Sequence, residues 1–336
     1  MNRDKIEIVA EIGQAHDGSL GIAHSYIDAA TEIGVDTVKF QTHLSEAESS
    51  VEEKFRLNFS YEDKTRLDYW KRMEFDFKSW EGLYSHAKDN KLNFLSTPFC
   101  VEAVDLLESI GVDRFKVGSG DTSNFLMLDK IAKTGKPIIL SSGMSTFKEI
   151  DATIEFLKEY DSEITIMQCT TSYPTNPRDW GLNVIEELYE KYNLPIGFSD
   201  HSGDIFSGLA AATLGVNVLE FHLVFDKNMF GPDSTSSLNI EQAKTLVRGV
   251  RQIEESKKYP IDKNNDNKFK KIKVIFGKSL SVNKDLHAGH ILRIDDLESK
   301  KPGGFGIKSS SFKNVIGKKL NKNKEKWSFL NESDIE

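Results

Sequence analysis

The sequence predicts an α/β protein that forms a (β/α)8 TIM barrel, followed by a small C-terminal domain. Eight short apolar runs recur along residues 1–258, and a helix-like segment follows each of them. Eight βα units over about 250 residues are typical of this barrel. The competing doubly wound sheet usually has fewer strands and a glycine-rich phosphate turn, and the chain contains neither a GxGxxG nor a Walker-type motif.

The expected strands and helices alternate in a regular order along the chain. The strands are expected at residues 7–11, 36–41, 93–97, 114–119, 137–141, 164–168, 195–198 and 216–220. Glycines that favour a helix C-terminus follow four of the intervening helices: Gly34, Gly111, Gly135 and Gly215. Thr146 and Glu149 form a capping-box pattern, which predicts the start of a helix that reaches Tyr160.

One long segment, residues 42–80, interrupts this alternation and is charged and aromatic. A loop of that length inside a regular α/β array is usually functional or disordered. We expect a substrate-covering excursion with a helix in its middle, in which Tyr69, Trp70 and Arg72 are candidates for substrate specificity. The alternative is that these aromatic side chains only pack together.

The composition changes after the barrel. Residues 259–273 are polar, charged and without periodicity, which predicts a linker. Residues 274–336 then form a second domain with short β-like runs at 279–282, 291–293 and 315–317. A domain of this size has a small core, so we expect it to pack against another surface.

The net charge and the cysteine content limit the binding partners and the cellular compartment that we expect. The formal net charge of −8 argues against a nucleic-acid-binding protein. We expect no membrane association, because the chain has neither a signal-peptide pattern nor an apolar run of membrane-spanning length. Cys100 and Cys169 lie in apolar runs without metal-binding spacing, which predicts buried, reduced thiols in a cytoplasmic protein.

Barrel enzymes carry their chemistry at the C-terminal ends of the strands. Lys39 and Lys116 end otherwise apolar strands, where a lysine is costly unless it meets an anion. Hydroxyl side chains end neighbouring strands: Thr97, Ser119, Ser141 and Ser199. Ammonium groups ringed by hydroxyl donors predict a phosphate or carboxylate site. The alternative is that each lysine pairs with a barrel carboxylate such as Glu11 or Glu220.

Two histidines follow the last pair of strands. The strand–helix–strand order makes these strands parallel neighbours, so His201 and His222 should emerge at the same end. With Asp200, Glu220 and Asp233 close in sequence, this pair is a candidate site for a divalent metal. The alternative is that the histidines only pack at strand ends.

The sequence resembles the sialic acid (nonulosonate) synthases over nearly the whole chain. Nine motifs carry the resemblance in order: AEIGQAHDG, VKFQT, LSTPF, FKVGSGD, ILSSGM, CTTSYPT, GFSDHS, LEFH and GPDSTSSL. The C-terminal KSL, KKPGGFGI and IGKKL stretches resemble the antifreeze-like (SAF) module of that family. The resemblance therefore implies a barrel followed by an SAF domain.

The resemblance also implies a reaction. Members condense phosphoenolpyruvate with an open-chain N-acylhexosamine, such as N-acetylmannosamine or a legionaminate- or pseudaminate-type precursor, and release phosphate. By this resemblance, His201 and His222 would bind Mn²⁺ or Mg²⁺. The catalytic residues would be Glu11, Lys39, Lys116 and Glu220, with Glu11 or Glu220 transferring the proton. The substrate-binding residues would be Gln41, Thr97, Ser119, Ser141, Thr171, Tyr173, Ser199, Asp233 and Lys301.

Some positions depart from the family pattern. In relatives, the small domain of one subunit covers the partner's barrel and delivers an arginine to the sugar, which implies a domain-swapped homodimer. Lys301 stands at the arginine position here, and it lacks the planar fork of a guanidinium. Ala15, Thr171 and Phe221 also differ from the residues common in relatives.

Two other functions compete with this interpretation. A Schiff-base aldolase would use Lys116 or Lys39 as its nucleophile and would not need the histidines. A non-catalytic sugar-binding relative would retain the fold without the reaction, because a fold alone does not decide function.

Overall fold

The computed structural model describes residues 5–57 and 59–336. The chain forms two compact units, the first ending at Tyr259 and the second spanning Pro260–Glu336. Among the described residues, no helix combines the length and the apolar character needed to cross a membrane.

The first unit is a parallel barrel, as predicted. Its strands are β1 (Glu7–Gly13), β2 (Thr37–Thr42), β3 (Asn93–Pro98), β4 (Phe115–Val117), β5 (Ile138–Ser141), β6 (Ile164–Cys169), β7 (Ile196–Asp200) and β8 (Val218–His222). They pair in the order β3-β2-β1-β8-β7-β6-β5-β4, which is a circular order with a seam between β3 and β4. Strand β4 is shorter than expected, because residues 118–119 already belong to the following loop.

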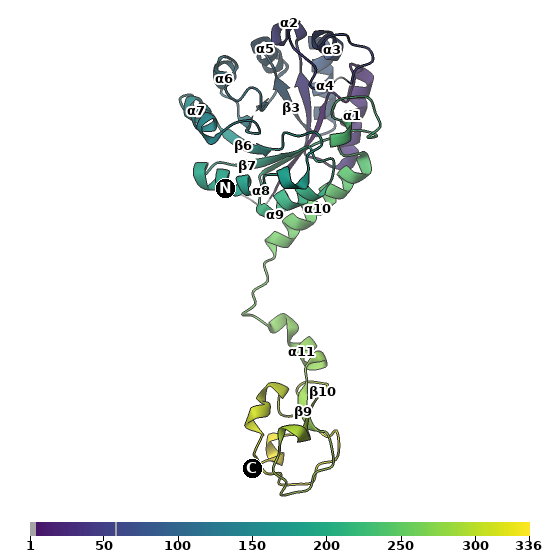
Figure 1. The fold of residues 1–336 in the computed structure, drawn as a ribbon, viewed down its shortest axis with the longest axis vertical. Helices are drawn as coiled ribbons and strands as arrows, with labels where there is room; N and C mark the ends of the chain where they lie inside the picture. The colour runs from purple at the N-terminus through teal and green to yellow at the C-terminus, as the bar shows by residue number, and fades with distance from the viewer. Residues whose placement is uncertain (1–4, 58) are drawn as a thin grey trace. The chain divides into compact units, whose positions relative to one another are not determined.

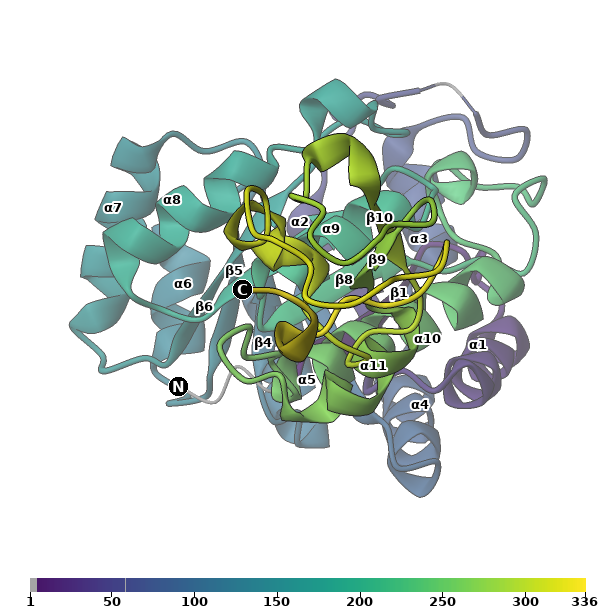
Figure 2. The same ribbon diagram turned by 90° about the horizontal axis from the view of Figure 1, so that it is seen from below.

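Helices surround these strands on the outside (Figures 1 and 2). They are α1 (Leu20–Ile33), α4 (Phe77–Asp89), α5 (Val101–Ile110), α6 (Phe125–Ala132), α7 (Phe147–Lys158), α8 (Leu182–Tyr192), α9 (Phe206–Leu214) and α10 (Ile240–Lys258). Gly34, Gly111 and Gly215 cap α1, α5 and α9 in the left-handed conformation, as predicted. Thr146 and Glu149 form the predicted capping box of α7.

The strands separate two apolar layers. In β1, Ile8 and Ala10 belong to the main core between strands and helices, whereas Val9 belongs to a small cluster that also contains Leu95 and Met167. The alternation follows from the two-residue period of a strand. The small cluster fills the barrel interior and forms the floor under the charged side chains at the strand ends.

The excursion contains two helices, α2 (Ser45–Glu48) and α3 (Arg66–Met73), so the expected helix in its middle is confirmed. Tyr69 and Trp70 are buried on α3 and pack with Phe55 and Phe59. The packing interpretation of this aromatic cluster therefore holds, although Trp70 also lines the cavity described below.

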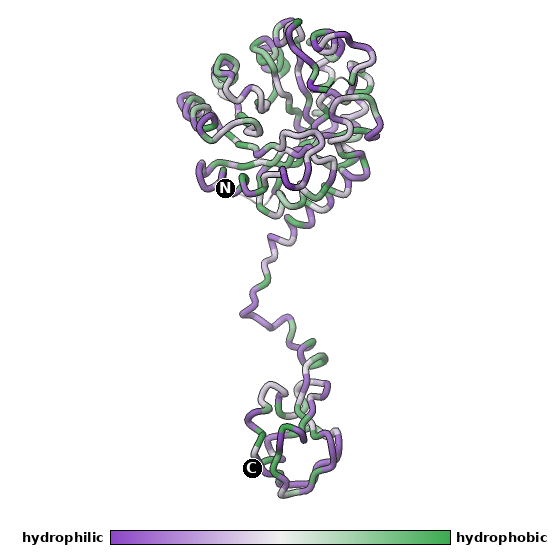
Figure 3. Tube along the Cα trace, in the orientation of Figure 1, coloured by the Kyte–Doolittle hydropathy of each residue, from purple (hydrophilic) through white to green (hydrophobic). Residues whose placement is uncertain are grey.

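The second unit has a small core of its own, which includes Leu280, Val282 and Leu330. Its strands β9 (Ser279–Val282) and β10 (Leu297–Lys300) are antiparallel. The β-like runs expected at 291–293 and 315–317 are not strands, and Ile291 makes only an isolated bridge to Lys319. The segment after α10 is mainly hydrophilic (Figure 3), and helix α11 (Lys270–Phe276) begins within the predicted linker.

Candidate active site

A cavity of about 580 Å³ opens at the C-terminal ends of the barrel strands. All the site residues predicted within the barrel line it: Glu11, Lys39, Gln41, Thr97, Lys116, Ser119, Ser141, Thr171, Tyr173, Ser199, His201, Glu220, His222 and Asp233. The remaining predicted site residue, Lys301, belongs to the second unit.

Two lysines and two glutamates form a buried network in this cavity. Lys39 Nζ lies 2.6 Å from Glu11 Oε2 and 3.5 Å from Glu220 Oε1. Lys116 Nζ lies 3.0 Å from both carboxylate oxygens of Glu220, which also accepts a hydrogen bond from Ser199 Oγ at 3.1 Å. The lysines therefore do pair with barrel carboxylates, as the alternative interpretation expected.

The network favours the charged forms of Lys39 and Glu220. Burial opposes the charge on Lys39, but attraction to Glu11 and Glu220 outweighs burial and raises the pKa of Lys39. Burial likewise opposes the ionised form of Glu220, but Lys116 and Lys39 lower its pKa. An ionised, ion-paired Glu220 is a poor proton donor and a weak base. These ion pairs therefore argue against Glu220 as the proton-transfer group.

Three hydroxyl groups face the cavity without an internal partner. The side chains of Thr97, Ser119 and Ser141 are lining residues. Among residues 5–57 and 59–336, the structure shows no hydrogen bond from these three hydroxyls. Because these hydroxyls line the same cavity as Lys39 and Lys116 and have no partner there, they are available to an anionic ligand.

The two predicted metal ligands lie side by side, with ring centroids 5.0 Å apart. His201 Nδ1 is 3.0 Å from Thr170 Oγ1, and its Nε2 is 3.1 Å from the Tyr173 hydroxyl. Burial, reinforced by His222, lowers the pKa of His201 well below its ordinary value. A neutral imidazole is the form that binds a metal ion.

The carboxylates near these histidines in sequence are engaged elsewhere. Asp200 accepts a hydrogen bond from Ser202 Oγ at 2.8 Å, and Asp233 accepts one from Arg56 at 3.1 Å. In the part of the chain that the structure describes, no three or more His, Cys, Asp or Glu side chains form a metal-binding group. The two adjacent imidazoles thus fit a divalent ion whose remaining ligands are substrate oxygens and water.

The structure adds lining residues that the sequence analysis missed. Arg56, from the excursion, lies 4.1 Å from the ring centroid of Tyr173 and pairs with Asp233. No periodicity marks Arg56, because it lies in an irregular segment. Asp121 also lines the cavity, and burial raises its pKa. Its place two residues after Ser119, at the end of the FKVGSGD motif, was the available signal.

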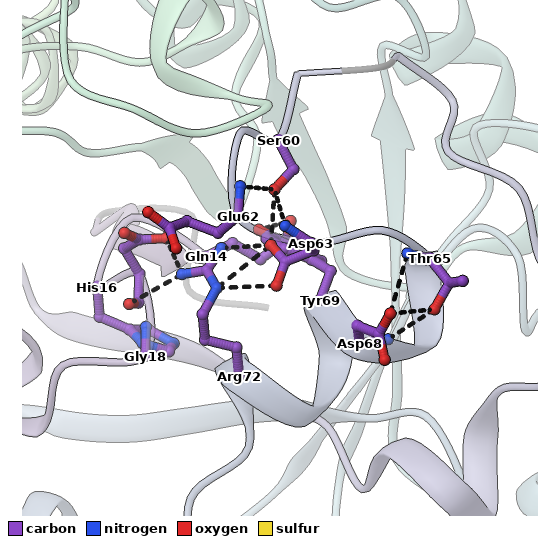
Figure 4. A network of polar contacts seen from close by, with 11 residues as sticks. Gln14, His16, Gly18, Ser60, Glu62, Asp63, Thr65, Asp68, Tyr69 and Arg72 are labelled. Carbon is purple, nitrogen blue, oxygen red and sulfur yellow. Dashed lines mark hydrogen bonds and ion pairs between the residues drawn. The ribbon is translucent and has the colours of Figure 1, made fainter.

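A polar network ties the excursion to the loop after β1 (Figure 4). The Arg72 guanidinium donates to Asp63 Oδ2 at 2.8 Å and to the Asp17 backbone oxygen at 3.3 Å. The Tyr69 hydroxyl donates to Gln14 Oε1 at 2.9 Å. Arg72 therefore anchors the excursion and is not among the residues that line the cavity, whereas Gln14 is.

Comparison with known proteins identifies the family of the chain. The sequence profile of the NeuB family matches residues 26–261. The chain belongs to the NeuB family. It is 36% identical to the N,N'-diacetyllegionaminic acid synthase of Campylobacter jejuni over 95% of this chain and 97% of that protein. It is 33% identical to the human N-acetylneuraminate-9-phosphate synthase, over 93% of this chain and 88% of that protein.

Solved structures of NeuB-like proteins share the fold. The crystal structure of N-acetylneuraminic acid synthetase from Leptospira borgpetersenii, in complex with citrate, has a TM-score of 0.71 and 28% identity. The match covers 81% of this chain and 91% of that chain.

Proposed function

We propose that this NeuB-family protein is a nonulosonic acid synthase that condenses phosphoenolpyruvate with an open-chain N-acylhexosamine and releases phosphate. The observation that carries the proposal is one cavity lined by Lys39, Lys116 and three unpartnered hydroxyls together with the adjacent pair His201 and His222. Relatives named as legionaminic, pseudaminic and N-acetylneuraminate-9-phosphate synthases support it.

Lys39 and Lys116, with Thr97, Ser119 and Ser141, would bind the phosphate and carboxylate of phosphoenolpyruvate. Ammonium and hydroxyl donors form charge-assisted hydrogen bonds with such oxygens. Glu11 and Glu220 balance the two lysines, so the network alone has no excess positive charge for an anion. A bound divalent cation would supply the positive charge that the network lacks.

His201 and His222 would hold that cation, Mn²⁺ or Mg²⁺, at the acceptor side of the cavity. When bound, the ion would polarise the acceptor carbonyl as a Lewis acid. Gln41, Thr171, Tyr173 and Asp233 also line this cavity and would orient the sugar: their amide, hydroxyl and carboxylate groups match sugar hydroxyls.

The proposed reaction forms a carbon–carbon bond at C3 and a carbon–oxygen bond between water and C2, and it breaks the carbon–oxygen bond between C2 and phosphate. C3 of phosphoenolpyruvate attacks the aldehyde carbon, and the aldehyde oxygen gains a proton. Water adds at C2, and phosphate leaves with the bridging oxygen. Asp121 lines the cavity and burial raises the pKa of its carboxyl group, so it would serve as the proton donor. Glu11, which accepts from Lys39 and Gln41, would orient the attacking water.

The second unit would be an antifreeze-like (SAF) domain, with residues 1–258 as the catalytic domain, 259–273 as the linker and 274–336 as the SAF domain. It would cover the partner's cavity in a domain-swapped homodimer and bring Lys301 to the sugar. Exposed apolar side chains on α11, such as Ile275 and Phe276, support a packing role. A monomeric mass for a fully active enzyme would contradict this arrangement.

We also propose that the protein acts in the cytoplasm, because the thiols of Cys100 and Cys169 are free and buried.

The test is phosphate release from phosphoenolpyruvate with a panel of N-acylhexosamines, with and without EDTA and added Mn²⁺. We expect release that requires both an acceptor and the metal. A Schiff-base aldolase would instead ignore EDTA and give a pyruvate adduct trapped by borohydride. The ion pairs that keep Lys39 charged oppose this alternative, because a Schiff base needs a neutral amine. No release with any acceptor would contradict the proposal.

A further inference from the structure

His43 is a buried histidine directly after β2, and the function proposed above assigns it no role. Its side chain is 2% exposed. Its ring is held between Trp70 at a centroid distance of 3.8 Å and Phe99 at 4.5 Å, with interplanar angles of 21° and 9°. Both aromatic residues line the cavity. The imidazole plane is therefore fixed, and its two nitrogens point to defined partners.

The neighbouring amide of Gln41 has one orientation that satisfies its contacts. Glu11 Oε2 lies 2.6 Å from the Lys39 ammonium, so this carboxylate is an acceptor. The Gln41 side-chain atom 2.7 Å from Glu11 Oε1 must then be the NH₂ group. The amide oxygen of Gln41 consequently faces away from Glu11.

Two groups approach that amide oxygen. Gln14 Nε2 lies 3.0 Å away, and the hydroxyl of Tyr69 donates to the other atom of the same Gln14 amide (Figure 4). His43 Nε2 lies 3.2 Å from the same Gln41 oxygen. An amide oxygen only accepts hydrogen bonds, so Nε2 of His43 must carry a hydrogen.

The other ring nitrogen has an acidic partner. His43 Nδ1 lies 2.7 Å from Glu48 Oε1, and Glu48 Oε2 accepts from the Leu44 backbone at 3.2 Å. One hydrogen shared between Nδ1 and Glu48 satisfies this contact. Whether that hydrogen resides on Nδ1 or on Glu48, Nε2 carries a hydrogen of its own and remains a donor. The groups form one chain from Glu48 through His43 and Gln41 to Glu11.

We propose that His43 is a positioning residue, which donates from Nε2 to Gln41 and thereby holds the Gln41 amide that orients Glu11 in the cavity. Its effect on catalysis rests on the proposed function, because Glu11 acts in that reaction. Loss of this donor would leave Gln14 as the remaining donor to the Gln41 oxygen, so the amide would be held less firmly and Glu11 would be misplaced. A small misplacement of a catalytic group costs about 100-fold in rate.

Three substitutions of His43 distinguish its role as a hydrogen-bond donor from its role in aromatic packing. His43→Phe keeps the stack between Trp70 and Phe99 but removes both ring nitrogens. His43→Gln can place an NH₂ near the Nε2 position, whereas His43→Asn can reach only the Nδ1 position. We expect kcat to fall about 100-fold in His43→Phe and His43→Asn, with the KM for phosphoenolpyruvate within about threefold. His43→Gln should recover to within about tenfold of the wild type.

His86→Phe is the matched control, because His86 lies on the outer helix α4 beside Asp28 and His24. It should keep wild-type kcat. The proposal would be overturned if His43→Phe kept kcat within about threefold of the wild type, or if His43→Gln were no better than His43→Phe.

A measurement without turnover distinguishes this inference from the proposed function. In the ¹H–¹⁵N NMR spectrum of the wild-type protein, we expect the His43 ring to carry a hydrogen on Nε2. A ring with hydrogen on Nδ1 alone would overturn the proposal. A wild-type protein that shows the expected spectrum but releases no phosphate with any acceptor would contradict the proposed function and leave the hydrogen-bond chain intact.

Discussion

Both ends of the barrel carry ion pairs, and the contrast between them shows what distinguishes a site from a structural contact. At the C-terminal end, the side chains of Lys39, Lys116 and Glu220 are each 4% exposed. At the N-terminal end, Arg114 donates to Glu7 Oε2 at 2.7 Å, and these side chains are 20% and 21% exposed. Charge pairing occurs at both ends, so it does not mark the site.

The two ends of the barrel differ in whether their polar side chains have hydrogen-bond partners within the protein. At the N-terminal end, the Thr37 hydroxyl donates to Glu7, and Asp36 accepts from Lys5 at 2.7 Å and from the Ile8 backbone at 2.9 Å. At the C-terminal end, three hydroxyls face a cavity with no partner among the described residues. Unpartnered donors around a cavity, added to buried charge, indicate a ligand site.

The largest expected effect is at the C-terminal end. Lys116→Met should lower kcat/KM for phosphoenolpyruvate about 1,000-fold, because it removes a donor that faces the anion. Phosphate release measures this loss. Lys130→Met is the control, because Lys130 pairs with Asp105 outside the cavity. A loss smaller than about tenfold would contradict a role for Lys116 in binding the anion.

At the N-terminal end, the expected effect is on stability. Arg114→Met leaves Glu7 without its guanidinium partner, so the free energy of unfolding should fall by about 1–2 kcal/mol. Urea unfolding measures this change, and kcat/KM should match that of the wild type. Reduced activity in a correctly folded variant would place a functional role at both ends.

The excursion should contribute to acceptor binding more than to chemistry. Arg56→Gln removes the guanidinium over Tyr173 and its pair with Asp233. We expect the KM for the acceptor to rise about tenfold, with the KM for phosphoenolpyruvate unchanged. Lys64→Gln, at an exposed position of the same excursion, is the control. Equal effects on both substrates would argue against an acceptor-side role for Arg56.

The smallest effect concerns the pH dependence of stability. Burial opposes the ionised form of Asp36, but hydrogen bonds from Lys5, the Ile8 backbone and Arg251 outweigh it and lower its pKa. The free energy of unfolding of the wild type should exceed that of Asp36→Asn by at most about 1 kcal/mol. This difference should be present in full above about pH 4. That difference should vanish as the pH falls through the folded-state pKa. Urea unfolding as a function of pH measures it, and a difference that grows on acidification would contradict the assignment.

The regular part of the fold was predictable from the sequence, because its signals are local. Apolar runs, helix-ending glycines and one capping box placed strands and helices nearly as observed. In a (β/α)8 barrel, the C-terminal ends of all strands meet at one face, so strand-end residues far apart in sequence were expected to lie together. Lys39, Lys116 and His222 do line one cavity. Parallel neighbouring strands likewise placed His201 beside His222.

The irregular parts were not predictable in the same way. Arg56 lies in a segment without periodicity, and Glu48 ends the four-residue helix α2, which is too short to show one. Only the folded chain therefore shows that these residues reach Tyr173 and His43. The pairing of Lys116 with Glu220 joins residues 104 positions apart, and spacing alone did not choose between an ion pair and an anion site. In the second unit, short apolar runs such as 291–293 lack the neighbouring strand that would complete a sheet.

Binding of phosphoenolpyruvate, measured by isothermal titration calorimetry, tests the central claim most directly. The wild type and Arg114→Met should bind it with equal affinity, and Lys116→Met should bind it at least about tenfold more weakly. Binding by Lys116→Met as tight as that of the wild type, or an equal loss in Arg114→Met, would contradict the assignment of the anion site to the C-terminal end of the barrel.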